Sequence, residues 1–312
     1  QNQQHPSALS QSSVCSCCHR SPMSTATLSH TALPPAGWWI HGAKDEELLQ
    51  AFSLDADTHI LRQSKRLHYE GNFLFLFCGS ERAVLFDTGA LSSTLAAPLV
   101  GTVQRLVAHR RKDAGDYEVV VAHTHAHNDH VAGDVLFVDQ PGFRVVPASD
   151  LAAVQVEFSI ARWPDSLGCM RLGAERELTV LPTPGHEPVH VMIYDPLHAL
   201  LLTGDHLYRG RLYMRDQAAF TASVARALRF CESNPVRHLL GCHIEMSADG
   251  TEYPDETIYQ PNEPPLQLNV EHLRKLHLIL QGHSTSVITD RIHCGEFIIH
   301  PVLSSVGEES SK

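Results

Sequence analysis

The sequence has no long apolar segment, since no run reaches the roughly 18 residues that a membrane-spanning helix needs. It also lacks the basic start and apolar core of a secretory signal peptide at its N-terminus. Because the chain does not begin with methionine, a secreted mature form is compatible with it as well. We therefore expect no membrane partner and leave the localisation open, with the cytoplasm slightly favoured.

Positive charge is scarce. The chain has 24 Lys and Arg against 35 Asp and Glu, a net charge of −11, and its densest basic stretch, 105–112, has the spacing of a solvated helix face. Nucleic-acid binding depends on basic side chains that displace counterions from phosphates. We predict that nucleic acid is not a partner.

Regularly spaced cysteines are also missing. Eight are present, but five are scattered, and Cys15, Cys17 and Cys18 crowd into one CSCC run. A disulfide framework in a chain of this length needs a more even distribution. The crowded run lacks the C-x-x-C spacing of a structural zinc site, so its role stays open.

The composition changes after the first 36 residues. Residues 1–36 are rich in Gln, Ser, Thr, Pro and Ala and predict a flexible extension, whereas 37–312 reads as one packed domain. Apolar runs and helical spacings alternate along that domain, which predicts a layered α/β fold. The expected strands are 58–62, 72–78, 83–86, 117–122, 144–147, 178–181, 190–194, 199–203, 238–241 and 297–302. The expected helices are 99–110, one from about 149, 218–231 and 270–281, and 247–268 is expected to be a loop.

Histidine is abundant, with 22 in 312 residues, and one cluster stands out. His125, His127, Asp129 and His130 follow an expected buried strand, so they lie at its end, where loops gather functional groups. Imidazole and carboxylate are donors that Zn²⁺ accepts in catalytic sites. Four such donors within six residues predict a metal site.

Three more donors follow other expected strands. His186 ends a tight TPGH turn, Asp205 ends TGD and His243 ends GCH. A single residue of any of these types is more often structural. Together with the dense cluster, they provide enough ligands for two ions.

The motifs HTHAHNDH, LFDTG, TPGH, TGD and GCH, in this order over about residues 55–300, resemble the signature of the metallo-β-lactamase superfamily. The resemblance implies a four-layer αββα sandwich with two metal ions at one edge of its sheets. It implies that His125, His127 and His186 hold the first ion. Asp129, His130 and His243 would hold the second, and Asp205 would bridge both. Asp87 matches a structural Asp that orders the ligand loop.

The resemblance also implies a reaction. Two Zn²⁺ ions about 3.5–4 Å apart would share a hydroxide that attacks a carbonyl carbon. Asp129 would steer this nucleophile and carry its proton. Iron or manganese suits the same nitrogen and oxygen donors, because geometry and availability decide between these metals.

Departures from the family pattern limit the classes of substrate that we expect. True β-lactamases of this superfamily carry Cys or Ser where this chain has Asp205, which argues against penicillin hydrolysis as its main activity. The 38 positions between Asp205 and His243 are too few for the insert of the processing nucleases. No Lys or Arg lies between His243 and Arg274, so this segment has no basic side chain to bind the anionic substrate of a glyoxalase II.

Tyr208 lies three residues after Asp205, the spacing at which lactonases of this family place a tyrosine that donates to the substrate carbonyl. It is either such an oxyanion donor or an aromatic residue packed beside the site. We expect a hydrolase of a small ester, lactone or thioester, lactonase-like or glyoxalase II-like, with an undetermined oligomeric state. The alternatives are a phosphodiesterase or nuclease on the same fold, and a binding protein with an inactive site.

Overall fold

The computed structural model describes residues 32–39, 46–91, 97–111 and 116–303. The first of its two large sheets has the order β1-β2-β3-β4-β5-β6. Its strands are β1 (Leu49–Ser53), β2 (Thr58–Gln63), β3 (Phe73–Cys78), β4 (Arg82–Phe86), β5 (Glu118–Ala122) and β6 (Phe143–Val145). Strands β1 to β4 pair antiparallel, and β4, β5 and β6 pair parallel.

The second large sheet has the order β13-β12-β10-β9-β8-β7. Its strands are β7 (Gly168–Gly173), β8 (Arg176–Pro182), β9 (Val191–Asp195), β10 (Leu200–Gly204), β12 (His238–Gly241) and β13 (Gln267–Leu268). A third sheet joins β11 (Arg211–Met214), β15 (Ile298–Pro301) and β14 (Ile292–His293).

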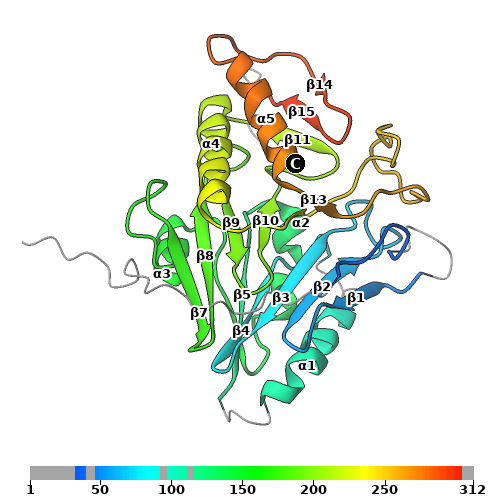
Figure 1. Cartoon of the computed structure of the whole chain (residues 1–312). Helices are drawn as coiled ribbons and strands as arrows, with labels where there is room; N and C mark the ends of the chain where they lie inside the picture. Colours follow the sequence, from blue (N-terminus) through cyan, green and yellow to red (C-terminus); the bar gives the residue numbers. More distant parts are fainter. Residues whose placement is uncertain (1–31, 40–45, 92–96, 112–115, 304–312) are drawn as a thin grey trace, which may run out of the picture.

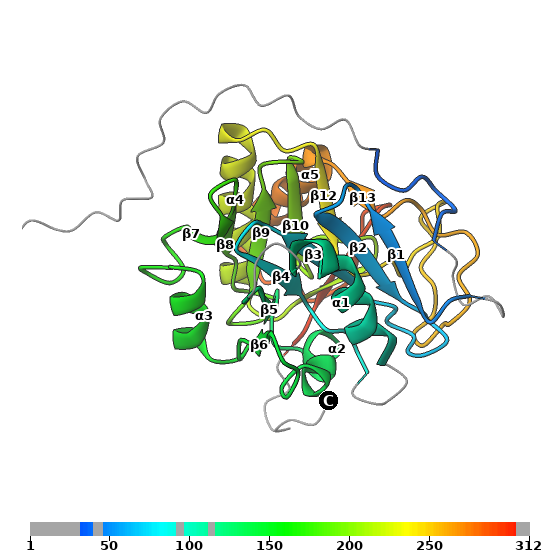
Figure 2. The ribbon, with the colours of Figure 1, turned by 90° about the horizontal axis from the view of Figure 1, so that it is seen from below.

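Helices cover both outer faces of the paired sheets. Helix α1 (Ala97–Arg111) packs on the first sheet, while α4 (Gln217–Ser233) and α5 (Val270–Gly282) pack on the second. Figure 1 shows α4 and α5 above the strands and α1 below them, and Figure 2 shows the same layers from below. This confirms the predicted four-layer αββα sandwich. Helix α3 (Leu151–Glu157) adds Val154 to the core between the sheets. Within the described part of the chain, no helix has both the length and the apolar character to cross a membrane.

Strand β3 shows why a continuous apolar run forms a strand here. Phe73, Phe75 and Phe77 lie in the core between the sheets. Leu74 and Leu76 point to the opposite face, where they pack with α1. Successive side chains of a strand alternate between its faces, so a strand covered on both sides must be apolar throughout.

All of the expected strands and helices are present, and their ends differ from the expected ones by at most two residues. The sequence analysis missed β1, β7, β11, the two-residue strands β13 and β14, and the short helices α2 (Asn128–Val131) and η3 (Ala132–Leu136). Leu33 and Pro34, which fall in the expected flexible extension, are buried in this structure. The rest of that extension up to residue 31, with its three crowded cysteines, lies outside the described residues.

A buried ion pair connects the first sheet to the long loop that follows β12. Arg62 on β2 and Glu263 lie 2.8 Å apart at both pairs of atoms, and both side chains are fully buried. The guanidinium also stacks on the Phe73 ring at 4.7 Å and contacts the Gly71 carbonyl at 3.4 Å. The loop is thereby fixed against the strands that lead to the ligand residues.

A second polar cluster joins the turn before β2 to the turn between β9 and β10. His198 Nδ1 lies 2.8 Å from Asp195, and His198 Nε2 lies 2.9 Å from Asp55. Burial alone lowers the pKa of His198, but the hydrogen bonds and charges of these two carboxylates outweigh it and raise the pKa to about 9. The imidazolium therefore bridges the two turns at neutral pH.

Replacing His198 with Gln is expected to lower the free energy of unfolding by about 2 kcal/mol at about pH 6, because two charged partners lose their cation. The pKa of His198 is higher in the folded chain than the ordinary histidine value of 6.5, so its contribution is complete below pH 6.5. The contribution disappears as the pH rises through about 9, so the free energies of unfolding of the wild type and of His198→Gln should converge above that pH. Urea unfolding across this pH range measures the difference.

The matched control is His293→Gln, since His293 is exposed on β14. It should change the free energy of unfolding by less than about 0.5 kcal/mol at every pH. A difference for His198→Gln that stays constant from pH 6 to pH 10 would contradict a charged bridge.

Candidate metal centre

The ligand residues predicted from the sequence all follow strands whose carboxyl ends meet at one edge of the sandwich. Strands β4 and β5 run parallel in the first sheet, and β10 and β12 run parallel in the second. Strand β8 is antiparallel to β9, and β9 to β10, so β8 points the same way as β10. The loops after these five strands therefore carry their side chains into one space.

Three ring nitrogens form the first group. His125 Nε2 lies 2.9 Å from His127 Nδ1 and 3.2 Å from His186 Nε2, and the last two atoms are 2.9 Å apart. His186 Nδ1 lies 2.7 Å from the Tyr213 carbonyl oxygen, which can only accept, so the proton of a neutral ring is on Nδ1 and Nε2 has a lone pair.

Two of these imidazoles, those of His125 and His186, are held in the neutral state. Burial is the main cause that lowers the pKa of His186 to about 4 and the pKa of His125 well below 6.5. Neutral nitrogens whose lone pairs face one another at about 3 Å repel unless a cation lies between them. The arrangement fits a divalent metal ion bound by three nitrogens.

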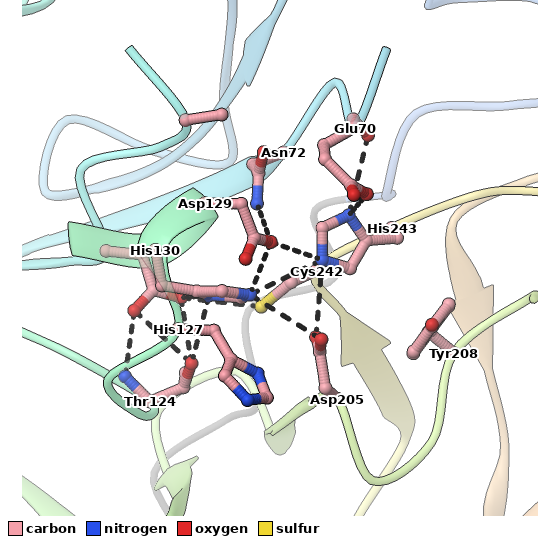
Figure 3. Close-up of polar contacts among 12 residues, drawn as sticks. Glu70, Asn72, Thr124, His127, Asp129, His130, Asp205, Tyr208, Cys242 and His243 are labelled. Atoms are coloured by element: carbon pink, nitrogen blue, oxygen red, sulfur yellow. Dashed lines mark hydrogen bonds and ion pairs between the residues drawn. The ribbon is translucent and has the colours of Figure 1, made fainter. Parts of the chain in front are cut away.

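Asp129, His130, His243 and Asp205 form the second group (Figure 3). Asp129 Oδ2 lies 3.1 Å from His130 Nε2 and 3.3 Å from His243 Nε2. Burial lowers the pKa values of the two histidines, but the neighbouring carboxylates, Asp129 and Asp205 among them, outweigh it and raise both pKa values well above 6.5. The group is thus strongly attractive to positive charge.

Asp205 lies between the two groups. Its Oδ2 is 3.6 Å from both His186 Nε2 and His130 Nε2, and its Oδ1 is 3.4 Å from His243 Nε2. Oδ1 is buried without a hydrogen-bond partner. Its 3.4 Å ion pair with His243 compensates its burial only in part, so this atom is suited to a metal ion. Asp205 therefore has the position of a bridging ligand.

The turns that deliver these ligands need glycine at two positions. Gly185 has φ of +134°, and a Cβ atom there would lie 2.3 Å from the backbone nitrogen of Phe220. Gly204 has φ of +51°, and a Cβ atom there would lie 2.5 Å from His190 Nε2. The glycines of TPGH and TGD thus allow His186 and Asp205 to approach the centre.

Asp87 orders the ligand loop, as the resemblance implied. Its carboxylate accepts a hydrogen bond from the Thr124 backbone nitrogen at 2.8 Å and lies 2.9 Å from His130 Nδ1. The Cys242 thiol lies 3.5 Å from the same carboxylate, and burial raises its pKa to about 12. Since the thiol stays protonated and His130 is shared, these three residues do not form an independent third site.

All seven predicted ligand residues thus come together in two groups, and within each group the donor atoms lie within 4.8 Å of one another. His123, His190 and His206 lie outside both groups. His123 contacts Asp134 at 2.8 Å, and His190 contacts Thr183 at 2.8 Å. His206 is fully buried and stacks on Phe220.

Three residues that contact the ligands were missed by the sequence analysis. Asn72 donates a hydrogen bond from its side-chain amide to Asp129 at 3.1 Å. Glu70 Oε2 lies 3.6 Å from His243 Nδ1, and Glu187 Oε1 lies 3.1 Å from His127 Nε2. Of these three residues, only Glu187 could have been suspected from the sequence, because it directly follows the TPGH motif.

Tyr208 is buried beside the second group, with its ring centre 5.3 Å from that of His243. Its hydroxyl donates a hydrogen bond to the Arg211 carbonyl oxygen. A hydroxyl has one proton, so this bond competes with donation to a substrate. The geometry favours packing over the oxyanion role, and Figure 3 marks no hydrogen bond or ion pair between Tyr208 and the other residues drawn.

Comparisons with known proteins agree with this geometry. The model of the metallo-beta-lactamase superfamily matches residues 70–243, more than half of the chain. Among solved structures, a metallo-beta-lactamase from Pontibacter korlensis has a TM-score of 0.50 and 20% identity over 75% of this chain and 99% of its own. One from Hirschia baltica has a TM-score of 0.50 and 17% identity, over 75% and 98%. At such low identities, the structural likeness shows a common fold alone. The match to the family model shows that the chain belongs to the metallo-beta-lactamase superfamily.

Proposed function

We propose that this protein is a zinc-dependent hydrolase of small, uncharged carbonyl compounds: an ester, lactone or thioester. The observation that carries the proposal is Asp205, whose carboxylate contacts histidines of both ligand groups. His125, His127 and His186 would hold one ion, and Asp129, His130 and His243 the other. Two such ions, when bound, polarise a carbonyl group and lower the pKa of a bound water toward about 7.

The residues of the chain contribute orientation and proton transfer. The Asn72 amide holds one oxygen of Asp129 at 3.1 Å, which fixes the plane of the carboxylate. The Asp129 side chain is 22% exposed, whereas that of His130 is fully buried. Asp129 is therefore the group suited to take a proton from the nucleophile and pass it to the leaving group.

The charges around the centre favour an uncharged substrate. Glu70 and Glu187 add negative charge beside the ligand histidines. Two buried cations, Lys65 after β2 and Arg211 on β11, already have partners. Lys65 donates to two backbone carbonyl oxygens, and Arg211 pairs with Glu245 at 3.4 Å and with further carboxylates. The two glutamates therefore offset part of the attraction that two bound ions would have for an anionic phosphodiester or glutathione thioester, and neither Lys65 nor Arg211 is free to add to that attraction.

Elemental analysis after reconstitution with zinc is expected to find about two zinc ions per chain. His127→Ala should lose about one of them together with ester hydrolysis, because three nitrogens define the first group. His123→Gln is the matched control, since His123 lies in the same loop but outside both groups, and it should keep about two ions. Less than half an ion per wild-type chain would contradict the proposal and favour a binding protein.

A panel of matched substrates tests the preference for uncharged carbonyl compounds. We expect kcat/KM for a neutral nitrophenyl ester to exceed that for its carboxylate-bearing analogue by about 10-fold or more at low salt, because local charge changes encounter rates by such factors. The ratio of the two kcat/KM values should fall as salt is added, because salt screens the charges. Faster release of nitrophenol from a bis-phosphodiester than from any ester, lactone or thioester would support a phosphodiesterase instead.

Tyr208→Phe decides between the two roles of this tyrosine. We expect kcat/KM to change by less than about threefold and the free energy of unfolding to fall by about 1 kcal/mol, because the variant loses a buried hydrogen bond. Tyr117→Phe is the control, since its hydroxyl also donates to a backbone carbonyl, that of Gly79, at 2.8 Å. A loss of about 100-fold or more in kcat for Tyr208→Phe alone would instead establish the oxyanion donor.

A further inference from the structure

His127 faces the first group differently from the other ligand histidines. His125 and His186 present Nε2 to this group, whereas His127 presents Nδ1. In the second group, His130 and His243 also present Nε2. The outer nitrogen of His127 is therefore Nε2, at the far end of the ring, and any group that holds the ring must reach it there.

The outer nitrogens of the other four rings lie close to polar groups. Those groups are the Thr124 hydroxyl at 3.1 Å from His125, the Asp87 carboxylate at 2.9 Å from His130, the Tyr213 carbonyl at 2.7 Å from His186 and the Glu70 carbonyl at 3.4 Å from His243. Nε2 of His127 is buried and makes no aligned hydrogen bond in the described structure. The Glu187 carboxylate lies beside it, with Oε1 3.1 Å from Nε2.

We propose that Glu187 is a positioning residue for the first metal ion, which it serves by accepting the Nε2 proton of His127 and so directing the Nδ1 lone pair toward the ion. A metal-bound imidazole commonly donates its second N–H to a carboxylate, which fixes the tautomer and the ring orientation. Glu187 supplies this carboxylate for His127, and Asp87 supplies it for His130 in the second group. The proposal rests on the proposed function for the presence of a bound ion.

The backbone around Glu187 is well anchored, which a positioning residue requires. The Gly185 carbonyl oxygen accepts hydrogen bonds from the Arg215 and Asp216 nitrogens at 3.0 and 2.9 Å. The Pro184 carbonyl oxygen accepts one from the Ser223 hydroxyl at 2.7 Å. These bonds tie the TPGH turn to the start of α4. His186 and Glu187 are consecutive, so one rigid turn both supplies one ligand and orients another.

The exposure of His127 explains why it needs this support. Its side chain is 23% exposed, whereas the side chains of His125 and His186 are almost fully buried. Packing fixes the two buried rings, but it restrains His127 less. A carboxylate that accepts the outer N–H also strengthens a metal-bound imidazole as a ligand.

The test measures zinc affinity of the full-length protein by chelator competition, without reference to activity. Glu187→Ala is expected to weaken one of the two binding steps by about 10- to 100-fold and to leave the other step unchanged. Glu187→Gln should recover most of that loss, because its amide oxygen still accepts the proton. Glu177→Ala is the matched control, since Glu177 is a partly exposed carboxylate on β8 that pairs with Arg171, and it should leave both steps unchanged.

A double-mutant cycle separates positioning from a general effect on folding. In a His127→Ala background, Glu187→Ala should have no further effect on zinc affinity, and the absorption spectrum of cobalt at the first site should change in the Glu187→Ala single variant. Unchanged affinity and spectrum in Glu187→Ala would overturn the proposal, as would equal losses in both backgrounds. A wild-type protein that binds no metal would overturn it together with the proposed function. A protein that binds two ions but cleaves no ester would contradict only the proposed function.

Discussion

Electrostatic compensation of seven donor side chains is the constraint on which the centre depends. Five imidazoles and two carboxylates place their donor atoms in two tight groups, and most of these side chains are buried. Lone pairs and negative charges at such distances repel unless positive charge lies between them. In the first group burial keeps His125 and His186 neutral, and in the second group the carboxylates raise the pKa values of His130 and His243. The site is thus prepared for cations before any binds.

The αββα sandwich provides the rigidity that this arrangement requires. The five strands that end at the centre are covered by helices on the outside and by the opposite sheet on the inside. Hydrogen bonds between strands and close packing leave their ends little freedom, so the loops begin from fixed points. Asp87 then connects the loops after β4 and β5 by two contacts of its carboxylate.

Local patterns in the sequence predicted a layered α/β fold and the clustered donors, whereas the four-layer arrangement and the assignment of the ligands to two ions came from the family resemblance. Apolar runs such as that of β3 predict buried strands, and short motifs at strand ends predict donors. Strand β7 was missed because its glycines and Arg171 interrupt the apolar pattern, and β11 because it has only 4 residues. The partners of the ligands could not be predicted, since Glu70 and His243 are 173 positions apart and meet only in the folded chain. Spacing alone also left the role of Tyr208 open, because it does not show where the hydroxyl points.

Because of the buried pair of Arg62 and Glu263, the residues of the loop after β12 differ in how readily they can be substituted. Removing either partner leaves an uncompensated buried charge, which destabilises a protein by about 3–5 kcal/mol, so the two positions can change only together. Ile258 and Tyr259, in contrast, lie in the same loop with half or more of their surface exposed. Natural variation and laboratory libraries can therefore diversify the stretch around these two residues while the anchor preserves its attachment to the sheet.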